Sequence, residues 1–258
     1  MKKLLFLMIA TLLFGFEVSV TILPQKGIIE AIAKDKVKVN VMVPPGNSPA
    51  TYSPSFKELK AIRNSKVYFT IGVPFDKKYL DKIKSINPSI KIVSFAKYIK
   101  TSKNPHIWLS PALLMLQAKI VLDILVDLDF KNKDFYLANY KEYIKKLSLL
   151  EVKGFREIKQ KAFITFHPSF YYFAKDFHLK EIAIQKEGKA PSFKYLSQII
   201  NLAKEEGVRV VIISPEFPKK YAQIVAKKIG AVVRVVSPLN EKPTFTINKL
   251  IKILNESR

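Results

Sequence analysis

The sequence contains no cysteine among its 258 residues. Disulfides, thiolate metal sites and the lipid-bearing cysteine of a lipoprotein are therefore excluded. Glycine is also scarce, with eight residues, and neither a Gly-x-Ser-x-Gly nucleophile motif nor a glycine-rich phosphate loop occurs. We therefore expect a protein that is not an enzyme.

Acidic residues are few beside basic ones, 21 against 44, and the formal net charge is +23. Such a balance is typical of proteins that bind nucleic acid or an anionic surface. The lysines, however, are spread along the whole chain among apolar residues and form no arginine-rich block. We expect no nucleic acid partner, and we favour attraction to an anionic membrane or cell-wall polymer.

Long apolar runs are absent except at the N-terminus. Lys2 and Lys3 precede an apolar run over residues 4–14, and the small residue Gly15 follows. This pattern is typical of an export signal, and no later stretch approaches the roughly 18 apolar residues of a membrane span. We expect residues 1–16 to be a signal peptide and the protein to be periplasmic or otherwise extracytoplasmic, either free or held by a retained signal anchor.

The remaining chain is rich in apolar residues, which make up 48% of the sequence and can supply substantial cores. Short apolar runs alternate with amphipathic helical stretches, which is the pattern of βα units around a mostly parallel sheet. One series of runs covers residues 18–23, 37–43, 67–71 and 90–93, and a second covers 162–166, 180–184, 208–213 and 232–236. The sequence therefore predicts an α/β protein with two lobes, residues 17–132 and 161–258, each with a mostly parallel sheet of about four strands flanked by helices.

Residues 133–160 separate the two series. Their apolar side chains recur at helical spacing among lysines and glutamates. The position of this stretch between two complete series favours one long connecting helix, which Gly154 is expected to end or weaken. Such a helix would limit hinge motion between the lobes, because bending it costs backbone hydrogen bonds.

Only three histidines occur, and two of them follow predicted strands. His106 lies in a proline-punctuated loop after the fourth strand of the first lobe, and His167 comes directly after the strand at 162–166. Ligands of open α/β sheets bind at the carboxyl ends of the strands, so both histidines are expected to face the cleft. His178 lies near a predicted helix end, where a surface or capping role is the expected one.

Several segments resemble a known family. They include Val43-Pro-Pro-Gly-Asn-Ser-Pro-Ala-Thr-Tyr-Ser-Pro-Ser55, Asn104-Pro-His-Ile-Trp-Leu-Ser-Pro111 and Phe163-Ile-Thr-Phe-His-Pro168, and later Gly188-Lys-Ala-Pro-Ser192, Lys204-Glu-Glu-Gly-Val208 and Val235-Val-Ser-Pro-Leu239. They look like the metal-binding periplasmic solute-binding proteins that serve zinc and manganese ABC transporters. The resemblance runs in order from about residue 18 to the C-terminus. It implies two α/β lobes joined by one long helix, with a metal held in the cleft between the lobes.

The resemblance also implies a ligand set, of which this sequence keeps half. The family's four ligand positions fall on Ala50, His106, His167 and Ser237. The cargo that the family implies is a divalent metal, zinc or manganese. Ala50 has no donor atom and Ser237 offers only a neutral hydroxyl, whereas tetrahedral zinc takes three or four nitrogen, sulfur or carboxylate donors. Two imidazoles with water would give a weak, exchangeable site.

Other donors are weaker candidates. Glu216 follows the strand at 208–213 and could complete the metal site, although a carboxylate that caps a neighbouring helix explains it as well. Glu187 precedes Gly188 in another loop after a strand and is a candidate of the same kind. Tyr52 and Trp108 could line the cleft, and core packing explains each of them equally.

The expected function is therefore the solute-binding component of an ABC uptake system, a monomer that presents its metal to a membrane permease. Acidic positions of the family have become Asn104, Ser110 and Ser237, which would suit a metal chelate or a small anion on the same scaffold. A third alternative is a surface adhesion or interaction protein whose metal site is vestigial.

Overall fold

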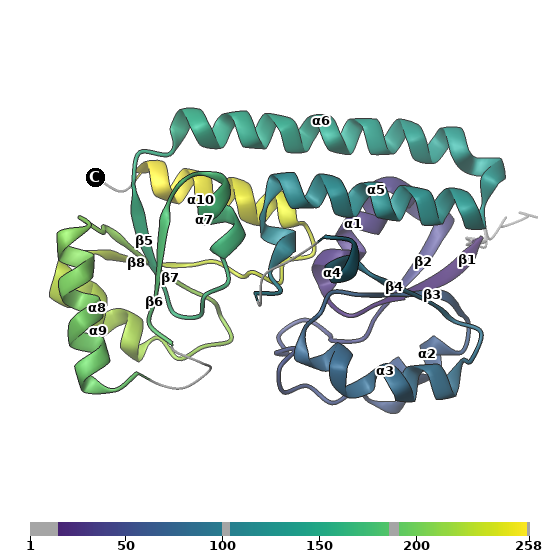
Figure 1. Cartoon of the computed structure of the whole chain (residues 1–258), viewed down its shortest axis with the longest axis horizontal. Helices are drawn as coiled ribbons and strands as arrows, with labels where there is room; N and C mark the ends of the chain where they lie inside the picture. The colour runs from purple at the N-terminus through teal and green to yellow at the C-terminus, as the bar shows by residue number, and fades with distance from the viewer. Residues whose placement is uncertain (1–14, 100–103, 186–190, 257–258) are drawn as a thin grey trace, which may run out of the picture.

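The computed structural model describes residues 15–99, 104–185 and 191–256, and it shows two lobes side by side along one long helix (Figure 1). The predicted signal segment, 1–16, lies outside the described residues except for its last two. Of these, Phe16 already begins the first strand, and the backbone N–H of Gly15 donates to the carbonyl of Lys36 at 2.9 Å.

Each lobe is built on a sheet of four parallel strands, as predicted. The first sheet contains β1 (Phe16–Val20), β2 (Val37–Val41), β3 (Ser65–Thr70) and β4 (Lys91–Ser94) in the order β2-β1-β3-β4. The second contains β5 (Ala162–Thr165), β6 (Lys180–Ala183), β7 (Val210–Ile213) and β8 (Val232–Val235) in the order β6-β5-β7-β8. The lobes thus repeat one topology, and their central strands are buried, as is usual for parallel sheets covered by helices.

The helices fill the intervals between the strands. They are α1 (Leu23–Ala33), α2 (Phe56–Ile62), α3 (Pro74–Ile86), α4 (Phe95–Tyr98), α5 (Pro111–Leu128), α6 (Lys133–Glu157), α7 (Tyr171–Asp176), α8 (Phe193–Glu205), α9 (Lys220–Ile229) and α10 (Pro243–Glu256), with short 3₁₀ turns at Lys34–Lys36 (η1), Ile107–Leu109 (η2) and Phe130–Asn132 (η3). The first predicted strand, 18–23, ends earlier than expected, at Val20. Pro24 lies in the first turn of α1, where its fixed φ favours a helix start.

The same four residues, Pro-Ser-Phe-Lys, begin α2 and α8, which are equivalent helices of the two lobes. The hydroxyl of Ser55 or Ser192 caps each helix by accepting from a backbone N–H in the first turn. The phenylalanines that follow are exposed, Phe56 to 77% and Phe193 to 92%.

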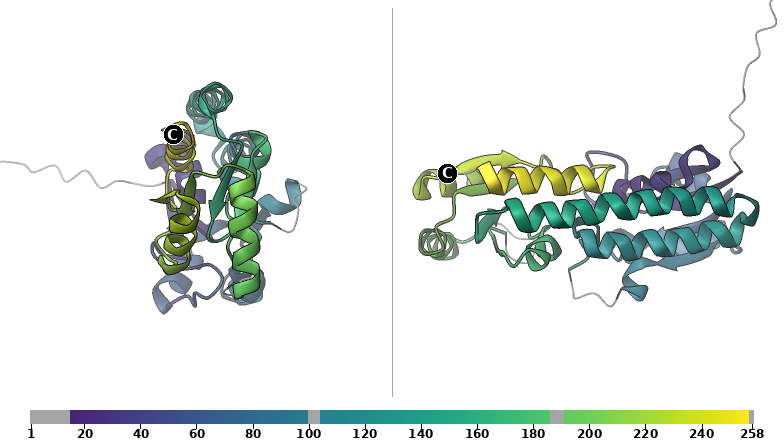
Figure 2. Two further views of the ribbon diagram at one scale, coloured as in Figure 1. Left: turned by 90° about the vertical axis from the view of Figure 1, so that its left-hand side faces the viewer. Right: turned by 90° about the horizontal axis from the view of Figure 1, so that it is seen from above.

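The predicted connecting helix is α6, which runs along the first lobe and reaches the second lobe (Figures 1 and 2). Gly154 lies inside it and does not end it, contrary to expectation. A Cβ atom at this position would meet the ring of Phe177 at 2.2 Å, so the glycine provides room for that ring.

The two lobes are joined by more than α6. Helix α10 follows the last strand of the second lobe, yet it packs against α6 and reaches α1 and η2 of the first lobe. Its apolar residues, including Leu250 and Leu254, belong to the same core as the buried residues of the first lobe. The backbone of Gly27 in α1 lies so close to the carbonyl of Glu241 that a Cβ atom would overlap it. The lobes therefore share one hydrophobic core, and a smaller core lies within the second sheet.

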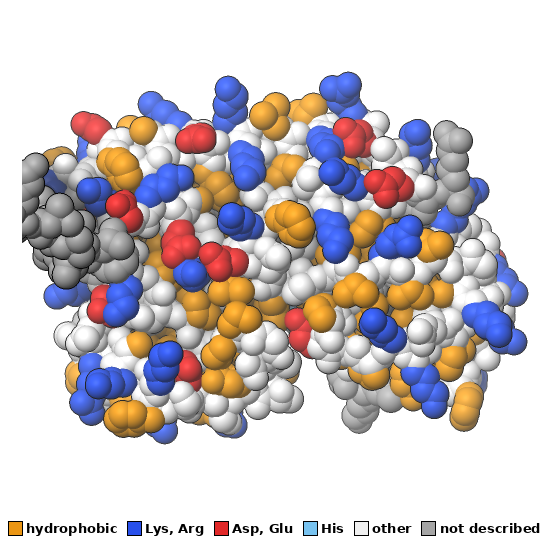
Figure 3. Space-filling model, turned by 180° about the vertical axis from the view of Figure 1, so that it is seen from behind, with side chains coloured by type: hydrophobic (Ala, Val, Ile, Leu, Met, Phe, Trp, Pro, Cys, Tyr) orange, Lys and Arg blue, Asp and Glu red, His pale blue; other side chains and the backbone are white. Residues whose placement is uncertain are grey.

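Lysine and arginine side chains are spread over both lobes in the view from behind, where a notch separates the lobes at the lower edge (Figure 3). Within the described residues, no helix combines the length and the apolar composition needed to cross a bilayer.

Candidate metal centre

His106 lies directly before η2 and is positioned by its neighbours. Its backbone N–H donates to Oδ1 of Asn104 at 2.9 Å. Two residues later, the fully buried Trp108 donates from Nε1 to the carbonyl of Pro238 at 2.7 Å, and its ring centroid lies 5.0 Å from that of His106. The loop that carries His106 is thus fixed to the segment after β8 in the other lobe.

His167 lies just beyond the carboxyl end of β5, as predicted. The backbone N–H of Phe166 still bonds to the carbonyl of Ile212 in β7, and the carbonyl of His167 accepts from the N–H of Ser169 at 2.7 Å. The ring of Phe217 packs against the imidazole with centroids 5.6 Å apart. An apolar wall therefore covers one side of this histidine.

The structure brings the two histidines together across the lobes. Their ring centroids are 5.3 Å apart and their planes meet at 68°, and both side chains are half-buried. This juxtaposition joins residues 61 positions apart in sequence, which each lobe presents at the carboxyl ends of its strands.

Each imidazole is oriented by a neutral amide. Nδ1 of His106 lies 2.7 Å from Oδ1 of Asn104, and Nδ1 of His167 lies 2.8 Å from Oε1 of Gln185. An amide oxygen only accepts, so each Nδ1 must carry the proton and donate. Nε2 of both rings is then the unprotonated nitrogen, which is the form that binds a metal.

Asn104 also ties the two lobes to each other. Its side-chain Nδ2 donates to the backbone carbonyl of Pro168, next to His167, at 2.9 Å. The backbone carbonyl of Asn104 accepts from the hydroxyl of Tyr172 at 3.0 Å. The donation to Pro168 fixes which end of the amide faces His106. One side chain thereby orients one histidine and holds the segment of the other.

Burial keeps both imidazoles neutral. Desolvation lowers the pKa of His106 to about 3, and the neighbouring His167 adds a smaller effect in the same direction. Desolvation also lowers the pKa of His167, against the opposing effect of its bond to Gln185. At neutral pH the pair presents two uncharged nitrogen donors.

Among the described residues, the other predicted ligand positions add no third strong donor to the pair. Ala50 lies exposed in the loop between β2 and α2, and Ser237 is half-buried with its hydroxyl accepting from the N–H of Leu239. Glu216 is half-buried after β7, and Glu187 lies outside the described residues. In the part of the chain that the structure describes, no group of three His, Cys, Asp or Glu side chains is placed to hold a metal.

Three other residues singled out in the sequence lie elsewhere. His178 is exposed with a positive φ of 54° after α7 and does not join the histidine pair. Tyr52 donates to Glu58 at 3.1 Å and stacks on Phe75. Ser110 caps α5 and donates to Asp176 at 2.5 Å, which adds another contact between the lobes.

Gln185 is the residue of the site that the sequence analysis missed. It comes directly after the predicted strand at 180–184, so it shares the strand-end position that drew attention to His167. Amide side chains at that edge deserve the same weight as charged ones when they can orient a ligand.

Comparison with known proteins gives one family and several relatives. Residues 18–256 match the family model described as zinc-uptake complex component A, periplasmic. The chain is 28% identical over 246 residues to the high-affinity zinc uptake system protein ZnuA of Bacillus subtilis, covering 85% of this chain and 77% of that protein. It is 26% identical over 263 residues to a putative metal-binding protein of Thermotoga maritima, covering 98% and 96%. A crystal structure of ZnuA superposes with a TM-score of 0.87 at 35% identity, covering 94% of this chain and 99% of that one.

Proposed function

The chain belongs to the family of periplasmic zinc-uptake components, and we propose that it binds a divalent metal, zinc or manganese, between its lobes as the solute-binding component of an ABC uptake system. The observation that supports this most strongly is the pairing of His106 with His167, each with Nδ1 engaged by an amide oxygen.

The spacing of the two rings fits one shared ion. Zinc binds an imidazole nitrogen at about 2.1 Å, and the ring centre lies roughly 1.2 Å behind that nitrogen, so two rings at a tetrahedral angle around one ion would have centroids roughly 5 Å apart. The observed 5.3 Å agrees with this value. Imidazole favours zinc over manganese, which prefers oxygen ligands, so zinc is the preferred cargo of this pair.

The remaining coordination positions would be filled by solvent or by protein oxygens. Ser237, which falls on a ligand position of the family, and Glu216, which follows β7, are the candidates. Such a site releases its ion readily, which suits a carrier that hands its cargo to a membrane permease. We place the protein outside the cytoplasm, exported by its N-terminal segment, acting as a monomer without catalytic activity. Its lysine excess favours contact with an anionic membrane or cell-wall surface there.

A calorimetric titration of the metal-stripped protein with zinc and with manganese tests the proposal. Trp108 is the only tryptophan in the chain and lies beside His106, so its fluorescence provides a second signal from the site itself. We expect submicromolar to micromolar zinc binding that disappears in the double variant His106→Ala/His167→Ala. His178→Ala is the matched control, since it removes the exposed histidine alone. Absence of binding above a millimolar background would refute the metal-carrier proposal.

One observation favours a second cargo. The two imidazoles are oriented by uncharged amides, and no carboxylate completes a three-residue group among the described residues. A metal that arrives with its own carboxylate or amine donors would need only these two nitrogens from the protein. Titration with zinc citrate or zinc–histidine complexes separates the two possibilities, because a chelate carrier would bind the complex more tightly than the free ion.

A further inference from the structure

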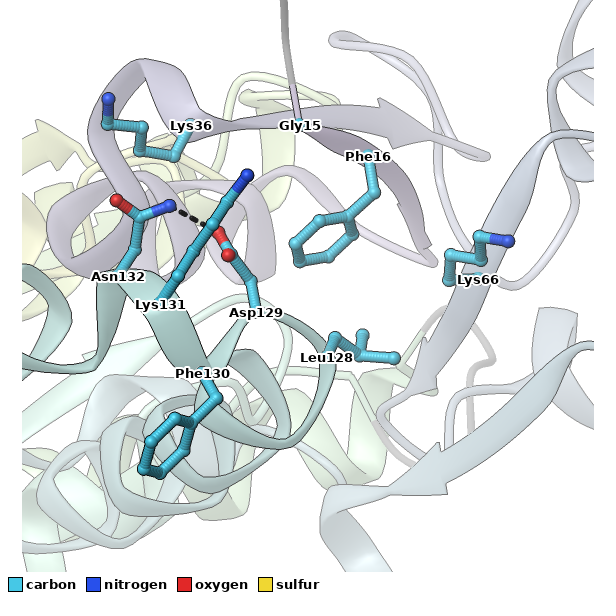
Figure 4. Close-up of a pocket in the computed structure, with 9 residues that line it drawn as sticks. All are labelled: Gly15, Phe16, Lys36, Lys66, Leu128, Asp129, Phe130, Lys131 and Asn132. Carbon is cyan, nitrogen blue, oxygen red and sulfur yellow. Dashed lines mark hydrogen bonds between the residues drawn. The ribbon is translucent and has the colours of Figure 1, made fainter.

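A depression of about 720 Å³ lies at the amino end of the first sheet, away from the histidine pair at the carboxyl ends of the strands. It is formed where β1, η1, β3 and the turn between α5 and α6 meet (Figure 4). Its lining residues are Gly15, Phe16, Lys36, Lys66, Leu128, Asp129, Phe130, Lys131 and Asn132. The proposed metal function uses none of them.

The floor of this depression is apolar and its rim is cationic. The side chains of Phe16 and Leu128 lie between Lys66 on one side and Lys36 with Lys131 on the other (Figure 4). None of these lysines forms an ion pair with another residue that the structure describes.

The acid in the depression is already engaged. The carboxylate of Asp129 accepts from the hydroxyl of Tyr136 and from Nδ2 of Asn132, both at 2.7 Å. Asp129 forms no ion pair with the lysines of the rim among the described residues, and one carboxylate offsets only part of the charge of three lysines, so the depression keeps a net positive charge around an apolar floor.

An exposed aromatic ring extends this surface. Phe130 lies in η3, the turn of the α5–α6 hairpin, directly before Lys131 in the sequence, and is 70% exposed. The Nζ atom of Lys133 lies 5.5 Å from the centroid of its ring. An exposed aromatic ring flanked by lysines is the composition that settles at a bilayer interface, with the ring among the acyl chains and the ammonium groups at the phosphates.

The chain itself points to a bilayer as the occupant. Gly15 lines the depression and is joined directly to residues 1–14, which carry Lys2, Lys3 and the apolar run 4–14. If the segment acts as the predicted export signal and stays attached as an anchor, it holds this end of the molecule at the bilayer.

We infer that the depression and Phe130 form a docking surface for an anionic lipid bilayer, whose phosphate groups bind Lys36, Lys66 and Lys131. Attraction of a lysine to an anionic membrane surface contributes roughly fivefold to affinity for each residue and is screened by salt. The surface lies at the far end of the first sheet from the histidine pair, so membrane contact there leaves the metal site accessible.

The test is sedimentation of the exported protein, with its N-terminus defined by mass spectrometry, with vesicles of phosphatidylglycerol and phosphatidylcholine or of phosphatidylcholine alone. The variant Lys36→Gln/Lys66→Gln/Lys131→Gln should bind the anionic vesicles at least tenfold more weakly than the parent. Its matched control, Lys194→Gln/Lys219→Gln/Lys227→Gln, removes equal charge from the second lobe and should lose less than about threefold.

A second pair of variants tests the aromatic contact. Phe130→Ser should weaken vesicle binding several-fold, whereas Phe193→Ser, which removes an even more exposed ring from the other lobe, should not. Equal losses in the two lysine variants would show attraction by net charge alone. Equal losses in the two phenylalanine variants would show nonspecific apolar adsorption. Either result would overturn the proposal. Competition by glycerol phosphate at millimolar concentration would also overturn it, since it would identify a soluble phosphate site instead of a bilayer contact. All variants change exposed side chains except at Lys36, which is half-buried, and thermal unfolding checks that each retains its fold.

Discussion

At the residue scale, two neutral amides occupy positions that carboxylates take in many zinc sites. Asn104 and Gln185 fix the tautomer of the imidazoles without adding negative charge. The amides therefore set the geometry of the pair, while the apolar surroundings of Trp108 and Phe217 keep both rings neutral. A carboxylate would both orient an imidazole and add negative charge, whereas these amides only orient it.

Changing Gln185 tests whether its amide acts by orienting the ring of His167. Gln185→Ala removes the acceptor for Nδ1 of His167, and we expect zinc affinity to fall about 10- to 100-fold. Gln185→Glu keeps an acceptor at the same reach and adds a charge, so affinity should equal or exceed that of the parent. Chelator competition followed by Trp108 fluorescence measures both. If both variants bind like the parent, Gln185 does not position His167.

Glu181 predicts a pH dependence of stability. Burial raises the pKa of this carboxyl from 4.5 to about 7, although Oε1 accepts from the N–H of Phe170 and the hydroxyl of Thr165. The folded state therefore binds more protons than the unfolded state between these pH values, and the free energy of unfolding falls as pH rises through the interval.

The variant Glu181→Gln keeps an acceptor oxygen without the charge. We expect it to be more stable than the parent by about 1 to 3 kcal/mol at pH 8, with the difference vanishing below pH 4.5. Urea unfolding at several pH values measures this. A difference that is constant with pH would mean that Glu181 does not titrate in this range.

The sequence identified both histidines because their chemistry and their strand-end positions coincide. It could not show that Asn104 reaches Pro168 in the other lobe, because that bond depends on how the lobes pack. It also could not show whether Glu216 joins the pair, since the position of this residue depends on a loop conformation that no periodicity encodes.

At the element scale, the strands were predicted well because each is a short apolar run bounded by turn residues. The connecting helix was predicted over 133–160 and observed over Lys133–Glu157. The role of α10 was not predictable, because an amphipathic pattern shows that a helix buries one face but not against which lobe. Gly154 was misjudged for the same reason, since the ring that requires it comes from a different element.

The variant Gly154→Ala tests the contact between α6 and Phe177. Alanine favours a helix over glycine by about 1 kcal/mol, so this change would stabilise an unobstructed helix. Here the new methyl group would collide with the buried ring, and we expect a loss of about 1 to 3 kcal/mol in the free energy of unfolding.

The background Phe177→Ala provides the control. With the ring removed, the same Gly154→Ala change should stabilise the protein, and urea unfolding of all four proteins gives the coupling directly. A stabilising Gly154→Ala in the parent would contradict the packing described for this corner.

At the scale of the whole molecule, the lobes are held together by α6, by α10 and by side-chain bonds across the cleft. The bonds from Asn104 to Pro168, from Trp108 to Pro238 and from Ser110 to Asp176 all form between protein groups alone. Hinge closure like that of two lobes on flexible strands is not available to this architecture without breaking packed contacts.

We therefore expect little change of shape when metal binds. Small-angle scattering of the stripped and zinc-loaded protein should give the same radius of gyration within error, while Trp108 fluorescence changes. Asn104→Ala removes a bond between the lobes, so in this variant the radius of gyration of the stripped protein should exceed that of the zinc-loaded protein. A marked compaction of the parent on zinc addition would show that the lobes move as separate bodies.

The bonds that hold the cleft together also bear on how much of this carrier a cell can use. If the metal-free and metal-loaded proteins have the same shape, a permease that recognises this shape binds both. Copies made in excess of the available metal would then act as competitive inhibitors of their own transport system. Metal uptake should rise with the amount of carrier only until all the available metal is bound, and should then decline as empty copies accumulate.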